Sequence, residues 1–136
     1  MKADVKKHIG RQQDKKWKQY NENLQKFSVS NDFIGLASTY QEMANFVKNE
    51  GKDNTHLLDL AYEMKLKFQT NLLNEYKKSN VVTEVEIIAT DNSCEACMQL
   101  NGNIFPINEA LLKKLLPVKN CSHKYGCRCV YVPIVD

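Results

Sequence analysis

The sequence is poor in the residues that interrupt regular structure, with only 5 Gly and 3 Pro among 136 residues. This scarcity argues against a loop-rich or collagen-like chain. Hydrophobic residues make up 43% of the chain and charged residues 26%, which indicates a soluble globular protein and not a disordered one. No stretch approaches the roughly 20 apolar residues of a membrane-spanning helix, and the first residues lack the apolar core of a secretory signal. We therefore expect a cytoplasmic protein with no membrane partner.

Recognisable catalytic motifs are also missing. The sequence contains no Gly-rich phosphate loop, no Ser nucleophile elbow and no His-Glu-x-x-His motif. His8 and His56 lie at no spacing that would pair them with a base or a metal ligand. Because no base or nucleophile set stands out, we expect a protein that is not an enzyme. A thiol oxidoreductase and a metal-dependent hydrolase stay open as alternatives because the chain contains five cysteines.

Positive charge is concentrated at the beginning of the chain. Residues 1–28 contain eight Lys or Arg and three Asp or Glu, whereas residues 29–136 contain eleven and thirteen. Such a basic segment can contact phosphates, which makes nucleic-acid binding the alternative function. The simpler interpretation is a solvated, lysine-rich helix face.

Apolar residues recur at helical spacing in three segments, residues 4–27, 33–47 and 57–76, which predicts three amphipathic helices. Residues 28–32 and 53–55 are rich in Ser, Asn, Asp and Thr, the side chains that cap helix N-termini. The helices over residues 33–47 and 57–76 are joined by a short turn, so we expect these two to form an antiparallel hairpin. We expect a helical hairpin or a three-helix unit.

The pattern changes at Val81, where a β-branched, alternating segment over residues 81–90 predicts a strand. Two turns are expected, at Asp91-Asn92 and Asn101-Gly102. After the second turn the sequence predicts a short strand at Ile104-Phe105, a short helix from Asn108 through Leu116, and a last strand from Cys129. Pro133 places that last strand at a sheet edge or near its own end.

All five cysteines lie between positions 94 and 129. Cys94 and Cys97 form a Cys-x-x-Cys pair, and after 23 intervening residues a second group follows, which contains Cys121, Cys127 and Cys129. Two pairs of thiolates at such a separation are typical of tetrahedral structural zinc sites. An intracellular location and an odd number of cysteines both argue against a disulfide framework. We therefore predict Zn²⁺ as the cofactor.

This segment offers six donors for four coordination positions, which favours a closed structural site over a catalytic one. We predict that the four ligands are Cys94, Cys97, Cys121 and Cys127. Cys129 is the strongest substitute because residues two apart on a strand face the same side, and His123 is the next. The neighbouring cations Lys119, Lys124 and Arg128 are expected to offset the thiolate charge.

Two alternatives to metal binding stay open. A redox Cys-x-x-Cys usually opens a helix after a strand, but the residues between Cys97 and the turn at 101–102 leave little room for that helix. The cysteines can also be buried without a ligand, because Cys packs well as a small hydrophobe.

Residues 88–134 resemble the C-terminal part of phage Mu F-type head-morphogenesis (minor capsid) proteins. The matching elements, in order, are Thr90–Cys97 with its Cys-x-x-Cys, Leu100–Phe105 with its Leu-x-Gly, Leu116-Pro117, His123, Cys127-Arg128-Cys129 and Pro133. In this chain the proline that follows the family's histidine is absent, the His-to-Cys gap is one residue longer, and Cys121 is additional. The helical segment that precedes residue 88 does not match.

The resemblance implies a phage- or prophage-related protein with Cys94, Cys97, His123, Cys127 and Cys129 as site residues. The helix, strand and cysteine patterns predict an α+β fold with a helical domain over residues 1–80 and a cysteine-rich, zinc-stapled β-rich module over residues 81–136. We expect a non-enzymatic zinc-binding scaffold whose amphipathic helices contact a protein partner or a second copy.

Overall fold

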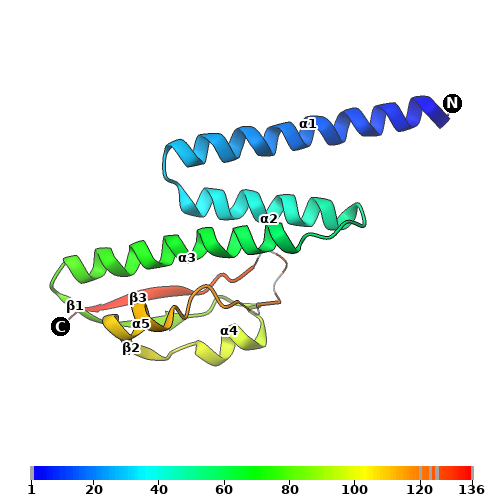
Figure 1. Cartoon of the computed structure of the whole chain (residues 1–136). Helices are drawn as coiled ribbons and strands as arrows, with labels where there is room; N and C mark the ends of the chain where they lie inside the picture. Colours follow the sequence, from blue (N-terminus) through cyan, green and yellow to red (C-terminus); the bar gives the residue numbers. More distant parts are fainter. Residues whose placement is uncertain (1, 120, 123, 125, 136) are drawn as a thin grey trace. The chain divides into compact units, whose positions relative to one another are not determined.

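The computed structural model describes residues 2–135 except 120, 123 and 125, and it describes side chains from residue 14 onward. Its helices and strands form an α+β fold, as the sequence predicted, with the helices first and a small antiparallel sheet afterwards (Figure 1). The chain divides into two compact units, residues 1–61 and residues 62–136. Among the described residues, no helix combines the length and apolar character needed to cross a membrane.

The first unit contains a hairpin of two helices, α1 (Lys2–Val29) and α2 (Phe33–Asn49) (Figure 1). The predicted break between them is confirmed. Asn31 adopts a left-handed conformation with φ 54, which Asn tolerates better than most residues. Asp32 then caps α2, because its Oδ1 accepts a 2.9 Å hydrogen bond from the Gly35 N–H.

Aromatic rings hold α1 and α2 together. The Trp17, Tyr20 and Phe46 rings lie with centroids 6.0–6.2 Å apart, in edge-to-face and tilted arrangements. Tyr20 is buried, and α2 contributes small and medium apolar side chains to the same unit's buried residues, namely Leu36, Ala37, Met43 and Ala44. The apolar stripes that predicted these helices are therefore the surfaces that pack.

The third helix, α3 (Thr55–Lys78), begins after a polar turn in which Asp53 Oδ1 accepts hydrogen bonds from the Thr55 N–H and hydroxyl. The two units divide inside this helix, between Ala61 and Tyr62, whereas the sequence suggested a division after residue 80. The reason is that the later turns of α3 belong to the core of the second unit, with Leu73 buried there.

The second unit is built on a three-stranded antiparallel sheet in the order β2-β1-β3. β1 (Val82–Ile88) is central, β2 (Ile104–Pro106) is a three-residue edge strand, and β3 (Val130–Val135) is the other edge. The predicted position of Pro133 in an edge strand is confirmed. One face of the sheet forms the core, where Val85, Ile87 and Tyr131 pack with α3 and α5.

Side chains of α3 cover the outer edge of β3. The Gln69 amide lies 3.4 Å from the Cys129 carbonyl oxygen, and the Tyr76 hydroxyl lies 3.4 Å from the Tyr131 carbonyl oxygen. Pro133 has no N–H to offer at this edge. Two backbone acceptors, one just before β3 and one inside it, are therefore occupied, and a third position lacks a donor, which disfavours edge-to-edge pairing with another strand.

Two sequence predictions about the short helices are wrong. The expected lack of room after Cys97 is contradicted by α4 (Glu95–Leu100), a six-residue helix with Cys94 as its N-cap. The helix expected from Asn108 through Leu116 is α5 (Ile107–Lys113), with Pro106 as its N-cap and Lys114 in a left-handed conformation after its end. Asn108 is thus inside the helix and not its cap.

Candidate metal centre

The five cysteines come from three segments of the second unit. Cys94 and Cys97 lie at the N-cap and in the first turn of α4, Cys121 lies in the loop that follows α5, and Cys127 and Cys129 immediately precede β3. None of the five forms a disulfide. The predicted turn at residues 91–92 is confirmed, with Asn92 at φ 65, and it leads the chain from β1 into α4.

Local backbone geometry prepares Cys94 to carry negative charge. The backbone N–H groups of Cys97 and Ser122 favour the thiolate and lower the pKa of Cys94 to about 6, although the sulfur makes no N-cap hydrogen bond to α4. Just before Cys127, Gly126 has φ 80, a conformation that few other residues adopt without strain.

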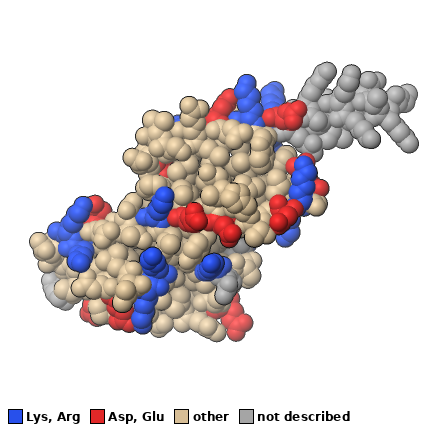
Figure 2. Space-filling model, viewed as in Figure 1, with Lys and Arg blue, Asp and Glu red and all other residues tan. Residues whose placement is uncertain are grey.

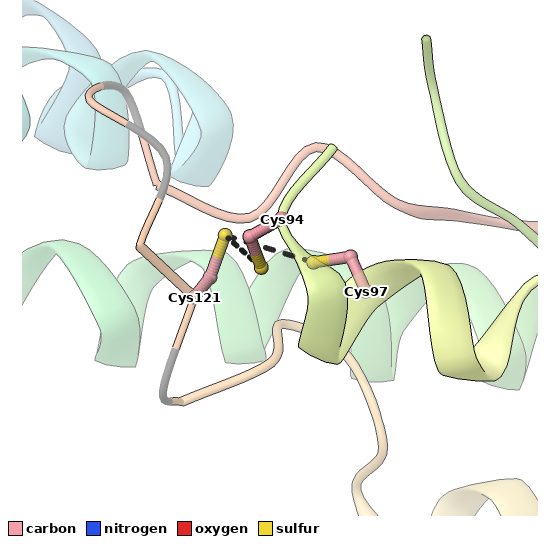
Figure 3. A group of neighbouring side chains, drawn as sticks. All are labelled: Cys94, Cys97 and Cys121. Atoms are coloured by element: carbon pink, nitrogen blue, oxygen red, sulfur yellow. Dashed lines mark hydrogen bonds between the residues drawn. The ribbon is translucent and has the colours of Figure 1, made fainter. Parts of the chain in front are cut away.

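The sulfurs of Cys94, Cys97 and Cys121 point toward one another (Figure 3). The distance from the Cys121 Sγ is 3.5 Å to the Cys94 Sγ and 3.6 Å to the Cys97 Sγ. Thiolates at 2.3 Å from a tetrahedral zinc ion lie about 3.8 Å from one another. These sulfurs therefore already have nearly the separation that one shared ion requires.

A second group of sulfurs shares Cys97 with the first. Cys97, Cys127 and Cys129 lie within 4.8 Å of one another, and the Cys97–Cys127 sulfur distance is 3.8 Å. Cys97 is thus the centre of the cluster. Its side chain is buried, as are those of Cys127 and Cys129, so this half of the cluster is shielded from water.

In the buried half of the cluster, which contains Cys97, Cys127 and Cys129, burial changes the pKa values of two thiols in the opposite direction. It raises the pKa of the Cys97 thiol, and it raises the pKa of Cys129 to about 11. Buried thiols without a cation therefore keep their protons, whereas a bound metal ion would displace them. The cluster can hold a metal ion, and its sulfur donors suit soft or borderline cations.

Lys65 of α3 brings a positive charge to the buried side of the cluster. Its Nζ donates a 2.6 Å hydrogen bond to the carbonyl oxygen of Cys127. Burial is the main cause that lowers the pKa of Lys65, and thiolate charge at Cys127 and Cys121 opposes that effect. The ammonium thus holds the backbone of a predicted ligand, and it lies where a positive charge would offset thiolate charge once the thiols lose their protons.

The sequence interpretation missed Lys65 and assigned the compensating charge to other cations. Of these, Lys119 lies over the Tyr62 ring at 5.6 Å, and the side chains of Lys124 and Arg128 are exposed. A signal for Lys65 was present, because it falls on the apolar stripe that predicted α3. A lysine at such a position must find a buried partner or extend to solvent.

The predicted donor His123 lies outside the described residues, as does the side chain of His8. His56 is exposed near the start of α3. The structure thus brings together all five predicted cysteine donors in two overlapping groups. No protein family, no curated protein and no solved structure matches this chain.

Proposed function

We propose that this chain is a non-enzymatic, zinc-binding scaffold protein in which Zn²⁺ staples the second unit. The observation that carries the proposal is the set of sulfur distances of 3.5–3.8 Å between segments that are 24 to 30 residues apart. An ion bound there would join α4, the loop after α5 and the segment before β3. Such a link compensates for the small size of the core in this unit.

We assign the four ligands to Cys94, Cys97, Cys121 and Cys127. Their sulfurs form a continuous series, because Cys94 neighbours Cys121, Cys121 neighbours Cys97, and Cys97 neighbours Cys127. Cys129 would then be a buried thiol beside the site and the first substitute ligand. A surplus of protein sulfur leaves no need for water at the ion, which is typical of structural sites and not of catalytic ones.

The origin of the protein belongs to the same proposal. The resemblance of residues 88–134 to phage Mu F-type head-morphogenesis proteins supports a phage- or prophage-derived scaffold acting inside the cell. That resemblance assigns His123 to the site in place of Cys121. Variants at Cys121 and His123 therefore decide between two assignments, the one based on the spacing and the one based on the resemblance.

Metal analysis of protein purified without chelator tests the proposal. We expect about one zinc per chain in the wild type, a loss of zinc in Cys97→Ser, and retention in the matched control Cys129→Ser. Metal-free wild type would overturn the proposal. An open water position on the metal, or a disulfide between Cys94 and Cys97 that cycles with a dithiol reductant, would instead establish one of the enzymatic alternatives.

Nucleic-acid binding is the second candidate, and the exposed lysines of α1 favour it. Lys15, Lys16 and Lys18 are all exposed. On the face shown in Figure 2, however, basic and acidic side chains are interspersed. Binding to DNA or RNA that weakens steeply with salt would support this function, and no binding at low salt would exclude it.

A further inference from the structure

The sheet of the second unit has a second face, opposite the core, and that face is mostly apolar. Directly paired residues of antiparallel strands share a face. In the register of this sheet, Glu86 of the central strand lies between Ile104 and Val132, and the neighbouring pairs place further residues on the same face. The apolar members of this outer face are Ile88, Ile104, Pro106, Val130, Val132 and Ile134.

This outer face is open in the structure. Ile104 is 50% exposed, Val130 44% and Val132 41%. An antiparallel sheet that faces water on one side normally carries polar residues there. Here the exposed positions are β-branched apolar residues of β2 and β3, the two strands that flank β1, and exposed apolar residues gathered on one face mark an interaction surface.

The edges of the sheet do not offer an equivalent site. At the β3 edge, side chains of α3 donate hydrogen bonds to the carbonyl oxygens of Cys129 and Tyr131. Pro133 has no N–H that could bond to an added strand. β2, the other edge strand, is only three residues long. A partner that adds a strand would therefore form few hydrogen bonds, so the partner must lie on the face.

The charges on the face specify the partner. Glu84 and Glu86 are half-buried in the central strand, and no ion pair recorded among the described residues involves either of them. A second copy that used the same face would oppose these carboxylates with its own, which is unfavourable. A partner with Lys or Arg between apolar side chains would pair with both carboxylates and cover the surrounding Val and Ile.

We propose that the outer face, defined by Glu84, Glu86 and the six apolar residues around them, docks a cationic amphipathic helix of a partner protein. A helix suits this position because a sheet with one helix-covered face is completed by a second layer of helices. The proposal names the partner of the scaffold function and rests on that part of it. It does not depend on which metal ion the cysteines bind.

The test uses the full-length protein and a fluorescent synthetic helical peptide of Leu and Lys at helical spacing, with fluorescence anisotropy as the readout. The control peptide has Glu in place of every Lys. We expect the Lys peptide to bind and the Glu peptide not to bind. Glu84→Gln/Glu86→Gln should weaken binding about tenfold, because both charge pairs are lost, and Val130→Thr/Val132→Thr should do so because apolar contact is lost.

The matched control is Asp59→Asn/Glu63→Gln, which removes the same charge from exposed positions of α3 and should bind as the wild type does. Circular dichroism and zinc content, measured on each variant, establish that the second unit is folded. Equal binding of the two peptides, wild-type affinity in both face variants, or equal weakening by the α3 control would each overturn the proposal. Wild-type protein that contains no zinc after purification would count against the proposed zinc site. It would not count against the proposed docking of a helix on the outer face.

Discussion

In the first unit, three aromatic rings from two consecutive helices lie within 6.2 Å of one another, and no cysteine is present. In the second unit, the closest side-chain neighbours at the centre of the cluster are thiols from segments up to 30 residues apart. The first arrangement is stabilised by direct apolar contact. The second places up to five ionisable sulfurs together, which is favourable only if protons or a cation neutralise them.

The two units are therefore stabilised by different kinds of contact. Helices that are close in sequence meet at little cost in loop-closure entropy, so apolar stripes and short turns suffice. The sheet of the second unit joins strands at opposite ends of its sequence around a small core. We therefore expect the first unit to be indifferent to metal and the second to depend on it.

Removal of the metal should give the largest effect. Structural zinc contributes on the order of 10 kcal/mol of folding free energy in small thiolate sites, which is comparable to the whole stability of a domain. We expect a chelator to abolish the amide-exchange protection of β1 and β3 while the fluorescence of Trp17 stays unchanged. Trp17 is the only Trp and lies in the first unit, so it reports on that unit alone.

Re-addition of zinc after chelation is the control, and it should restore the protection of both strands. If chelation shifted the Trp17 emission as much as it changed the strands, the two units would not differ in their dependence on metal. If neither signal changed, the cysteine cluster would be a packed core of thiols.

The converse change is Tyr20→Ala, which should destabilise the first unit. Tyr20 is buried and contacts both other rings of the aromatic group. Deleting a buried aromatic side chain typically costs about 3 kcal/mol, and chemical denaturation followed by Trp17 fluorescence measures this loss. Zinc content should stay at the wild-type value. Tyr20→Phe keeps the ring and is the matched control.

The sequence was sufficient to predict most of the fold, because its signals are local. Apolar spacing and caps located α1, α2 and α3, and the β-branched segment located β1. The ends of the short helices could not be predicted, because Pro106 begins α5 by its backbone conformation and provides no side-chain cap. The division of the chain inside α3 depends on long-range packing, which no local pattern records.

For the site, the cysteine spacing predicted which donors would meet but not how they share contacts. The central position of Cys97 and the proximity of Lys65 to Cys127 both arise from tertiary packing. The short helix α4 was missed because the gap between Cys97 and the turn at residues 101–102 left little room for a helix, although α4 begins directly after Cys94 and includes Cys97. Short-range rules cannot decide such a boundary.

Lys65→Met should have an intermediate effect that sharpens the role of charge in the second unit. The substitution keeps the length of the side chain but removes the hydrogen bond to the Cys127 carbonyl and the positive charge beside the thiolates. Residues that support metal ligands typically change affinity by about tenfold or more. We expect competition with a chromophoric chelator to show this weakening.

The matched control for this variant is Lys77→Met, since Lys77 is exposed in the same helix. It should bind zinc with wild-type affinity, and Lys65→Arg should recover part of the loss because the charge and a donor return. Equal affinities for Lys65→Met and Lys77→Met would show that the hydrogen bond to Cys127 only positions α3 and does not tune the metal.

The smallest effect is expected at the cap of α2, where the first unit uses a polar side chain in place of apolar contact. Asp32→Ala removes the acceptor of the Gly35 N–H and should lower the free energy of unfolding of this unit by about 1 kcal/mol. Asp32→Asn keeps an acceptor oxygen and should lose less. Because the cap lies in the unit without cysteines, neither variant should change zinc content or the exchange protection of β1, and a change in either would mean that the two units fold as one cooperative structure.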